Sequence, residues 1–291
     1  MDVVHTVDAA SWEGPFSEAE RRSAIVALES GMVVHFPRLP FALREEERAL
    51  LSPALSDGRA KNISLSASGK LKHTTAAGES YALLAAMMER FAQSSESLVG
   101  ALFPDYRGRL ERARTSFRPT EIEGRSTSPL HDDTRLHVDA FPTTPMHGRR
   151  ILRVFSNIHP EGRARLWNVG EPFALVARRF LPRLREPVPA KNWLLAIFGA
   201  THGLRTPYDD IMLGLHDAAK LDIGYQERCP KSRVAFAPGA TWLCYTDQVM
   251  HAVLSGQHAL EQTFHLGVGA MAAPDKAPIR VLEAMMRRKL A

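Results

Sequence analysis

The sequence has few of the features that mark secreted, membrane-spanning or zinc-stapled proteins. Cys229 and Cys244 are its only cysteines in 291 residues, so we expect neither a disulfide scaffold nor a cysteine-based zinc site, and a reducing compartment fits. It has no run of about 18 apolar residues, the length that a membrane-spanning helix requires. Its first residues, MDVVHTVDAASWEG, lack a basic flank followed by an apolar core, so we expect no signal peptide. These absences favour a cytoplasmic protein.

Acidic residues are outnumbered by basic ones. The chain has 37 Lys and Arg against 32 Asp and Glu, a formal net charge of +5, and a sequence pI of about 9.4. A basic balance favours anionic partners, such as acidic lipid, nucleic acid or a phosphorylated or carboxylated substrate. The arginines are scattered and no nucleic-acid-binding motif accompanies them, so we do not expect nucleic acid as a partner.

The first 110 residues form a mainly helical support in this interpretation. The capping box Ser17-Glu18-Ala19-Glu20 predicts a helix that runs to about Gly31. Further along, the patterns predict a strand, a short helix, a polar loop and a long amphipathic helix over residues 32–36, 44–51, 61–78 and 79–103.

From Thr115 the hydrophobic period changes to that of strands. Short apolar runs alternate with Gly, Pro and Asn breaks, at residues 115–122, 136–141, 151–158, 193–199, 233–237, 241–245 and 263–271. Many short strands separated by turns favour a sandwich or barrel. We therefore expect one α+β, mainly β domain over residues 1–291. Its β-core would span 111–272, with inserted helices at 173–181 and 208–219 and a closing C-terminal helix within 273–291.

His137, Asp139 and His251 form the most informative pattern. In a strand, residues i and i+2 point to the same face, so strand 136–141 would place His137 and Asp139 side by side. His251 follows an apolar strand and a turn, and it would begin a further strand. Two imidazoles and one carboxylate are the protein ligands of the facial triad that holds non-haem Fe(II) with three positions open. The pattern predicts an iron oxygenase.

Two ordinary interpretations compete with this one. The chain has 12 histidines, so a His-x-Asp triplet arises often by chance, and a lone His251 is more often a packed residue than a ligand. A rival triplet, His131-Asp132-Asp133, lies upstream in a polar run after Pro129. It is more typical of a loop, whereas His137 lies between apolar residues.

Iron bound in this way needs a reductant for O₂, and 2-oxoglutarate is the usual one. Its far carboxylate binds a cation, and Arg153 is the candidate because it shares one face of strand 151–158 with Phe155 and Asn157. An Arg among apolar residues is costly to bury without an anionic partner, and its guanidinium suits bidentate carboxylate binding. The alternative is an edge strand on which Arg153 faces solvent.

Three longer segments carry a resemblance to a known family. They are LHDDTRLHVDAFPTTPMHGRRILRVFSNIHP at 130–160, RLWNVGEPF at 165–173 and DQVMHAVLSGQHALEQTF at 247–264. Together they resemble the Kdo hydroxylases, a family of Fe(II)/2-oxoglutarate-dependent dioxygenases. The resemblance implies a double-stranded β-helix, or jelly roll, flanked by helices. It also implies hydroxylation at C3 of a Kdo sugar on a lipid A precursor, giving Ko.

The resemblance also implies roles for individual residues. His137, Asp139 and His251 would be the iron ligands, and Arg153 would bind the 2-oxoglutarate carboxylate. Many 2-oxoglutarate oxygenases place an Arg about ten residues after the second His. This chain has none there, and Asn157 and Gln262 are the further cosubstrate candidates.

Other activities and a membrane contact stay open at this point. The chain fits a 2-oxoglutarate oxygenase of a small metabolite or protein side chain, or a non-catalytic jelly-roll binding protein. The basic tip of the closing helix, Arg287-Arg288-Lys289, would touch an anionic membrane at the inner face of the bacterial inner membrane. In the alternative, that helix simply packs on the β-core.

Overall fold

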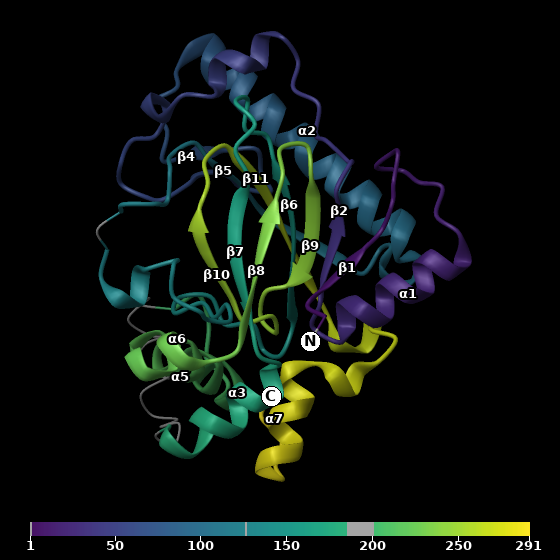
Figure 1. Cartoon of the computed structure of the whole chain (residues 1–291), viewed down its shortest axis with the longest axis vertical. Coiled ribbons are helices and arrows are strands. Elements are labelled where there is room, and N and C mark those ends of the chain that lie inside the picture. Colours follow the sequence, from purple (N-terminus) through teal and green to yellow (C-terminus); the bar gives the residue numbers. More distant parts are fainter. Residues whose placement is uncertain (1, 126, 185–200) are drawn as a thin grey trace.

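Two β-sheets that face each other form the centre of the molecule (Figure 1). The computed structural model describes residues 2–125, 127–184 and 201–291. The large sheet has the strand order β1 (Val4–Thr6), β2 (Val33–Phe36), β9 (Thr241–Tyr245), β6 (Arg150–Asn157), β11 (Ala259–Leu266), β5 (Leu110–Arg118), β3 (Ile63–Leu65) and β4 (Leu71–Lys72). The small sheet has the order β10 (His251–Ser255), β7 (Arg165–Gly170) and β8 (Lys231–Phe236). This is the expected jelly roll.

Helices flank the sheets on two sides. They are α1 (Glu18–Glu29), α2 (Gly78–Leu102), α3 (Phe173–Phe180), α5 (Pro207–Leu221), α6 (Ile223–Arg228) and α7 (Pro278–Met286). Short 3₁₀ turns occupy Glu46–Leu50, Pro53–Leu55, Pro104–Tyr106, Pro129–His131, Leu181–Arg183, Val268–Ala270 and Pro274–Lys276. No helix in the described ranges is both long and apolar enough to cross a membrane.

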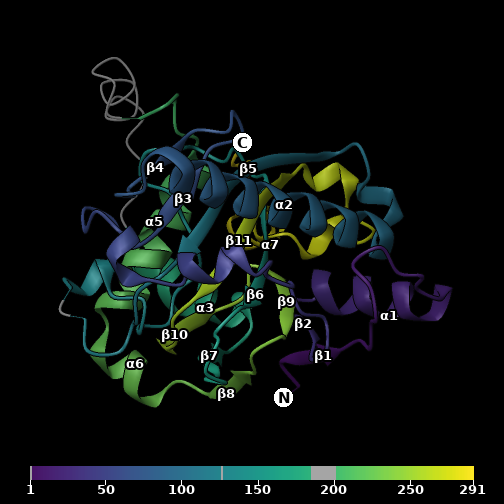
Figure 2. The ribbon, with the colours of Figure 1, turned by 90° about the horizontal axis from the view of Figure 1, so that it is seen from above.

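The two faces of the large sheet bury different side chains. On the outer face, Leu152, Val154 and Leu260 join the core under α1 and α2 (Figure 2). On the inner face, Phe155 and Trp242 stack and meet Trp167 of the small sheet. Strand alternation produces this division, because neighbouring residues point to opposite faces. The inner face is the one that carries the candidate site.

Most expected elements are present. The capping box at Ser17 opens α1, and α2, α3, α5, β2 and β9 lie where the sequence predicted them. The strands expected at 115–122 and 263–271 begin earlier, as β5 and β11, and α7 ends at Met286. The alternative of an edge strand with Arg153 in solvent is excluded, since β6 lies between β9 and β11 and Arg153 is buried.

Three predictions of secondary structure need correction. Residues 136–141 form no strand, and His137 makes only an isolated bridge to His251. The polar segment 61–78 is not all loop, because it contains the hairpin β3–β4 that ends the large sheet. The sequence missed β1, β7 and α6. The strand expected at 193–199 lies outside the described residues.

Candidate metal centre

The backbone brings His137, Asp139 and His251 together. The His137 N–H donates to the His251 carbonyl at 3.0 Å, and the His251 N–H donates back at 2.9 Å. The Asp139 N–H donates to the Thr246 carbonyl at 2.7 Å. The predicted i, i+2 pair therefore holds in space, although two short backbone links replace the expected strand. One segment follows β9, and the other leads into β6.

The three side chains converge on one point. One ligand atom from each residue lies within 4.8 Å of the others. The His137 Nε2 and Asp139 Oδ1 atoms are 3.7 Å apart, and the two imidazole centroids are 4.7 Å apart. Both histidines are buried, with 6% and 4% of their surface exposed. A metal ion of ordinary ligand distances fits this space.

Hydrogen bonds present both imidazoles in the form that binds metal. The Nδ1 atom of His137 lies 2.8 Å from the Arg135 carbonyl oxygen, and that of His251 lies 2.9 Å from the Val249 carbonyl oxygen. A carbonyl only accepts, so each Nδ1 carries the proton and each Nε2 is left as a lone-pair donor. Burial lowers the pKa of both histidines, and their mutual proximity lowers that of His137 further. Both rings are therefore neutral at physiological pH.

Asp139 is held in its ionised form. Burial alone would raise its pKa, yet the nearby Arg153 guanidinium holds the pKa of this carboxyl well below its usual range. The Arg153 Nη2 and Asp139 Oδ2 atoms are 2.9 Å apart. A neutral imidazole pair beside a carboxylate is the donor set that suits Fe(II), so the residues present fit a non-haem iron.

A cluster of arginines lies behind the metal trio. Arg153 also contacts Glu261 of β11 at 3.0 Å, and the same carboxylate contacts Arg118 of β5 at 2.6 Å. Arg165 of β7 is buried nearby, and burial together with Arg118 lowers its pKa. The Nε atoms of Arg153 and Arg165 are buried without a hydrogen-bond partner among the described residues. The cluster therefore has donors available for an anion.

The two further cosubstrate candidates lie elsewhere. The Asn157 amide donates to the Arg163 and Phe236 carbonyls and accepts from the His159 N–H, so it shapes a turn at the far end of β6. Gln262 accepts from the Thr115 hydroxyl and shares the outer face with Leu260, away from Arg153. Expecting either side chain at the site is wrong on this geometry, because register and alternation direct each elsewhere.

The rival triplet does not join the metal trio. His131 Nδ1 bonds the Ser128 hydroxyl at 2.8 Å, and Asp133 pairs with Lys61 at 2.7 Å.

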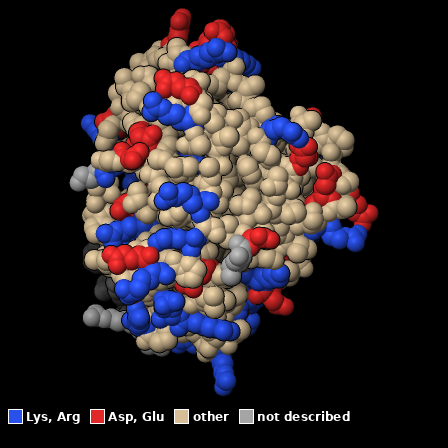
Figure 3. Space-filling view, in the orientation of Figure 1, with Lys and Arg blue, Asp and Glu red and all other residues tan. Residues whose placement is uncertain are grey.

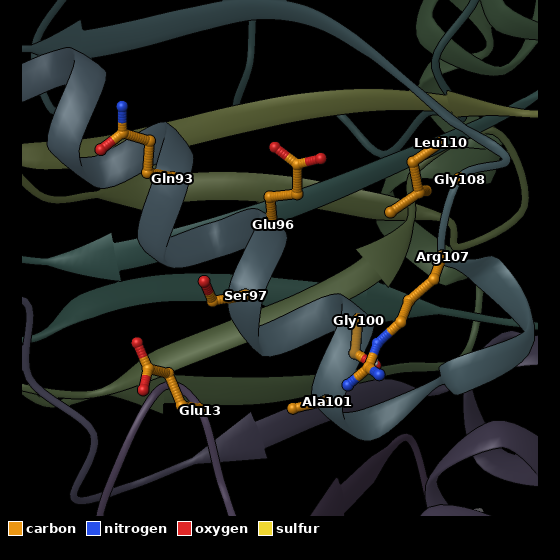
Figure 4. A pocket seen from close by; sticks show the side chains of 9 residues that line it. All are labelled: Glu13, Gln93, Glu96, Ser97, Gly100, Ala101, Arg107, Gly108 and Leu110. Atoms are coloured by element: carbon orange, nitrogen blue, oxygen red, sulfur yellow. Dashed lines mark hydrogen bonds between the residues drawn. The ribbon is translucent and has the colours of Figure 1, made fainter.

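A hollow of about 540 Å³ is also separate from the metal trio. It lies along α2, where Glu96, Gly100 and Arg107 line it (Figure 4), so it is on the outer side of the large sheet.

A protein-family comparison identifies what this geometry belongs to. The model of the 3-deoxy-D-manno-oct-2-ulosonic acid (Kdo) hydroxylase family matches residues 11–289. The chain belongs to the Kdo hydroxylase family. The predicted family and fold class are thus confirmed. A search of curated proteins gave no match.

Solved structures of one Kdo hydroxylase, KdoO, agree with this membership. The form with α-ketoglutarate and Fe(III) is 47% identical, with a TM-score of 0.96, over 99% of this chain and 97% of that one. The form with cobalt(II) is 48% identical, with a TM-score of 0.97 and the same coverage. The form with succinate and Fe(III) is 47% identical, with a TM-score of 0.95 and the same coverage.

Sequence reasoning missed several residues around the centre of this Kdo hydroxylase. They are Glu261, Arg118 and Arg165, which the strand patterns did not place beside the metal trio. His216 of α5 places its ring edge-on to His137, at 5.3 Å between centroids, and bonds Asp217. Strand alternation could have found Arg118, since it separates Arg118 from the core residue Phe117. No local signal marks His216.

Proposed function

We propose that this chain is an Fe(II)/2-oxoglutarate-dependent dioxygenase that hydroxylates C3 of a Kdo sugar on a lipid A precursor, giving Ko. The observation that carries the proposal is the buried His137–Asp139–His251 trio. Its imidazoles are fixed as lone-pair donors and its carboxylate is fixed as an anion. Family membership supplies the substrate class, a sugar acid.

The chain's own residues define what the bound metal can do. Three protein ligands leave three positions for cosubstrate and O₂. When bound, iron would activate O₂ with two electrons from 2-oxoglutarate, so that one oxygen atom enters an unactivated C–H bond and the other enters succinate, with loss of CO₂. The protein holds the ligands, orients the cosubstrate and excludes water. Trp167 stacks on His251 at 5.3 Å and closes one side of the trio with an apolar surface.

The distal carboxylate of 2-oxoglutarate is assigned to Arg153 within the arginine cluster. Arg153 is buried, faces the inner space and has an unsatisfied Nε donor. Arg165 adds a second unsatisfied donor from the opposite sheet. Glu261 occupies the stretch where many related oxygenases carry an Arg, and it holds Arg153 and Arg118 from that position. The positive charge is thus delivered by neighbouring strands instead of by β11.

Peripheral contact with an anionic membrane from the cytoplasmic side is part of the proposal. Figure 3 shows Lys and Arg side chains gathered on the lower part of the molecule, where α3, α5 and α6 lie in Figure 1. In α7, Ile279 and Leu282 are buried in the core, so its apolar side packs inward. Lys289 keeps 80% of its side chain exposed. The proposed contact of α7 is therefore its basic tip alone.

The test is mass spectrometry of Kdo-lipid A after incubation with the protein, Fe(II), 2-oxoglutarate and O₂. One added oxygen on the Kdo sugar, together with succinate, is the expected result. Omitting iron or 2-oxoglutarate should abolish it. Succinate formed only with another acceptor would favour an oxygenase of a metabolite or protein side chain. A protein that retains no metal and forms no succinate would be a binding protein.

A further inference from the structure

Arg114 of β5 is a guanidinium beside the metal centre that has no anionic partner. It forms no ion pair and no hydrogen bond within ranges 2–125, 127–184 and 201–291. Its side chain is exposed, unlike the mostly buried Arg118 and Arg153. An unpaired Arg on a solvent-facing surface needs no functional explanation. Whether Arg114 binds a ligand therefore depends on where its side chain lies.

The register places Arg114 on the inner face. Thr115 bonds Gln262 and Phe117 joins the outer core, so both point outward and Arg114 points inward. Gln262 pairs with Thr115 but Phe264 pairs with Arg112, so β5 has one extra residue between these pairs and Arg112 faces outward again. Thr263 of β11 pairs with Arg153 on one side, and its other side faces the part of β5 that includes Arg114. Neighbouring strands are about 4.8 Å apart, so the Arg153 and Arg114 backbones lie about 10 Å apart. A side chain as long as Arg spans much of that distance.

Electrostatics independently places Arg114 within reach of the centre. Burial lowers its pKa, Arg153 and Arg118 lower it further, and Glu261 and Asp139 act in the opposite direction. The exposed Arg114 guanidinium thus lies near these four charged side chains. The nearby acids are already used, since Asp139 pairs with Arg153, and Glu261 pairs with both other arginines.

The charge balance leaves the inner space positive. Four guanidinium groups, Arg114, Arg118, Arg153 and Arg165, meet two carboxylates, Asp139 and Glu261. An Fe(II) ion and a 2-oxoglutarate dianion cancel each other in formal charge. The inner space therefore stays positive with metal and cosubstrate bound, and it favours a substrate that carries an anionic group.

Resting on the proposed function, we propose that Arg114 binds the carboxylate of the sugar acid and selects acidic substrates. In a 2-ulosonic acid the carboxylate is C1, and only the C2 atom separates it from the reacting C3. A receptor for that carboxylate must therefore lie close to the metal trio. Arg114 meets this requirement, and its planar fork suits bidentate carboxylate binding.

The hairpin beside β5 extends the positive surface outward. Lys72 pairs with Ser64, which pairs with Ser116, and Leu71 is buried in the outer core. Lys72 therefore faces the same side as Arg114, and Lys70 lies in the adjoining turn. Both lysines are exposed. This edge favours approach of an anionic substrate toward Arg114.

The experiment compares Arg114→Gln with Arg112→Gln. Arg112 lies on the same strand but pairs with Glu89 on the outer face, so it controls for loss of charge and for strand stability. With Kdo-lipid A, Arg114→Gln should raise KM for the sugar substrate by about tenfold to a hundredfold. The kcat and the KM for 2-oxoglutarate should change less than threefold, and Arg114→Lys should restore part of the loss. Arg112→Gln should leave all three constants near wild type.

A substrate lacking the charge completes the test. Binding of free Kdo and of its methyl ester to protein loaded with Co(II) and 2-oxoglutarate is measured by calorimetry for wild type and Arg114→Gln. Wild type should bind the ester at least tenfold more weakly than the acid, whereas the variant should distinguish them by less than threefold. Equal discrimination by both proteins, or a raised KM for 2-oxoglutarate in the variant, would overturn the assignment. Wild type that forms no succinate at all would instead contradict the proposed function.

Discussion

The metal trio and the arginine cluster are built differently. The trio comes from two segments whose backbones bond to each other: His137, Asp139 and His251. The cluster comes from four strands: Arg118, Arg153, Arg165 and Glu261. In the first group, carbonyl oxygens fix each imidazole, so position and protonation are local properties. In the second group, the Glu261 carboxylate holds both Arg118 and Arg153, and Arg165 donates to the Gly256 carbonyl. The comparison indicates that the metal trio should tolerate changes around it, while the arginine cluster should respond as a unit.

The largest expected effect comes from removing one ligand of the trio. His137→Ala should abolish metal retention and reduce succinate formation to background, because two ligands from this set cannot hold Fe(II) firmly. Metal analysis and a succinate assay measure both. His131→Ala is the matched control and should keep full activity. Activity retained by His137→Ala would move the ligand role to His131 and Asp133.

Removing the shared carboxylate tests whether the arginine cluster is one unit. Glu261→Gln leaves Arg118 and Arg153 buried with less compensation, and breaking a buried pair costs about 3–5 kcal/mol. Urea unfolding measures this. Glu111→Gln removes an exposed partner of Arg149 and should cost under about 1 kcal/mol. Equal losses in the two variants would mean that Glu261 does not organise the cluster.

Arg153 is part of the arginine cluster and also contacts Asp139 of the metal trio. Its removal therefore tests how far the two groups depend on each other. Arg153→Ala should raise the 2-oxoglutarate requirement by about one to two decades, from the loss of about 1.5–3 kcal/mol of charge-assisted bonding. Because Arg153 also contacts Asp139, Fe(II) affinity should fall as well. Arg165→Met should weaken 2-oxoglutarate binding alone. An unchanged 2-oxoglutarate dependence in a folded Arg153→Ala protein would transfer the role to Arg118, Arg149, Arg150 or Arg165.

The smallest effect is expected far from both groups, at the tip of α7. Each basic residue near an anionic bilayer adds about 1 kcal/mol, so truncation after Met286 should reduce sedimentation with anionic liposomes at low salt. High salt should weaken binding of the intact chain in the same way. Binding absent at low salt, or unchanged after truncation, would reject this tip as the membrane contact. Turnover of a soluble Kdo substrate should not change.

The sequence predicted that His137, Asp139 and His251 lie together, and they do, but for a partly wrong reason. The pattern predicts a strand for His137 and Asp139, but they lie on an irregular segment that two backbone bonds link to His251 and one links to Thr246, just after β9. The residue types were sufficient despite this error, because two His and one Asp form a recognisable metal-ligand set on any backbone conformation. Asn157 and Gln262 had no such signature, and their predicted roles depended on position alone.

The amino-acid sequence by itself determined which side chains of a strand such as β6 point to each face of the sheet. Alternation along β6 sends Leu152 and Val154 to the outer core and Arg153 and Phe155 inward, because backbone geometry allows no other arrangement. Only the tertiary structure decided which charges meet. Arg118 and Glu261 are separated by 143 residues and become partners through the β5–β11 register. Pairing between distant strands depends on the whole sheet, so no local pattern could have revealed which arginine stays unpaired.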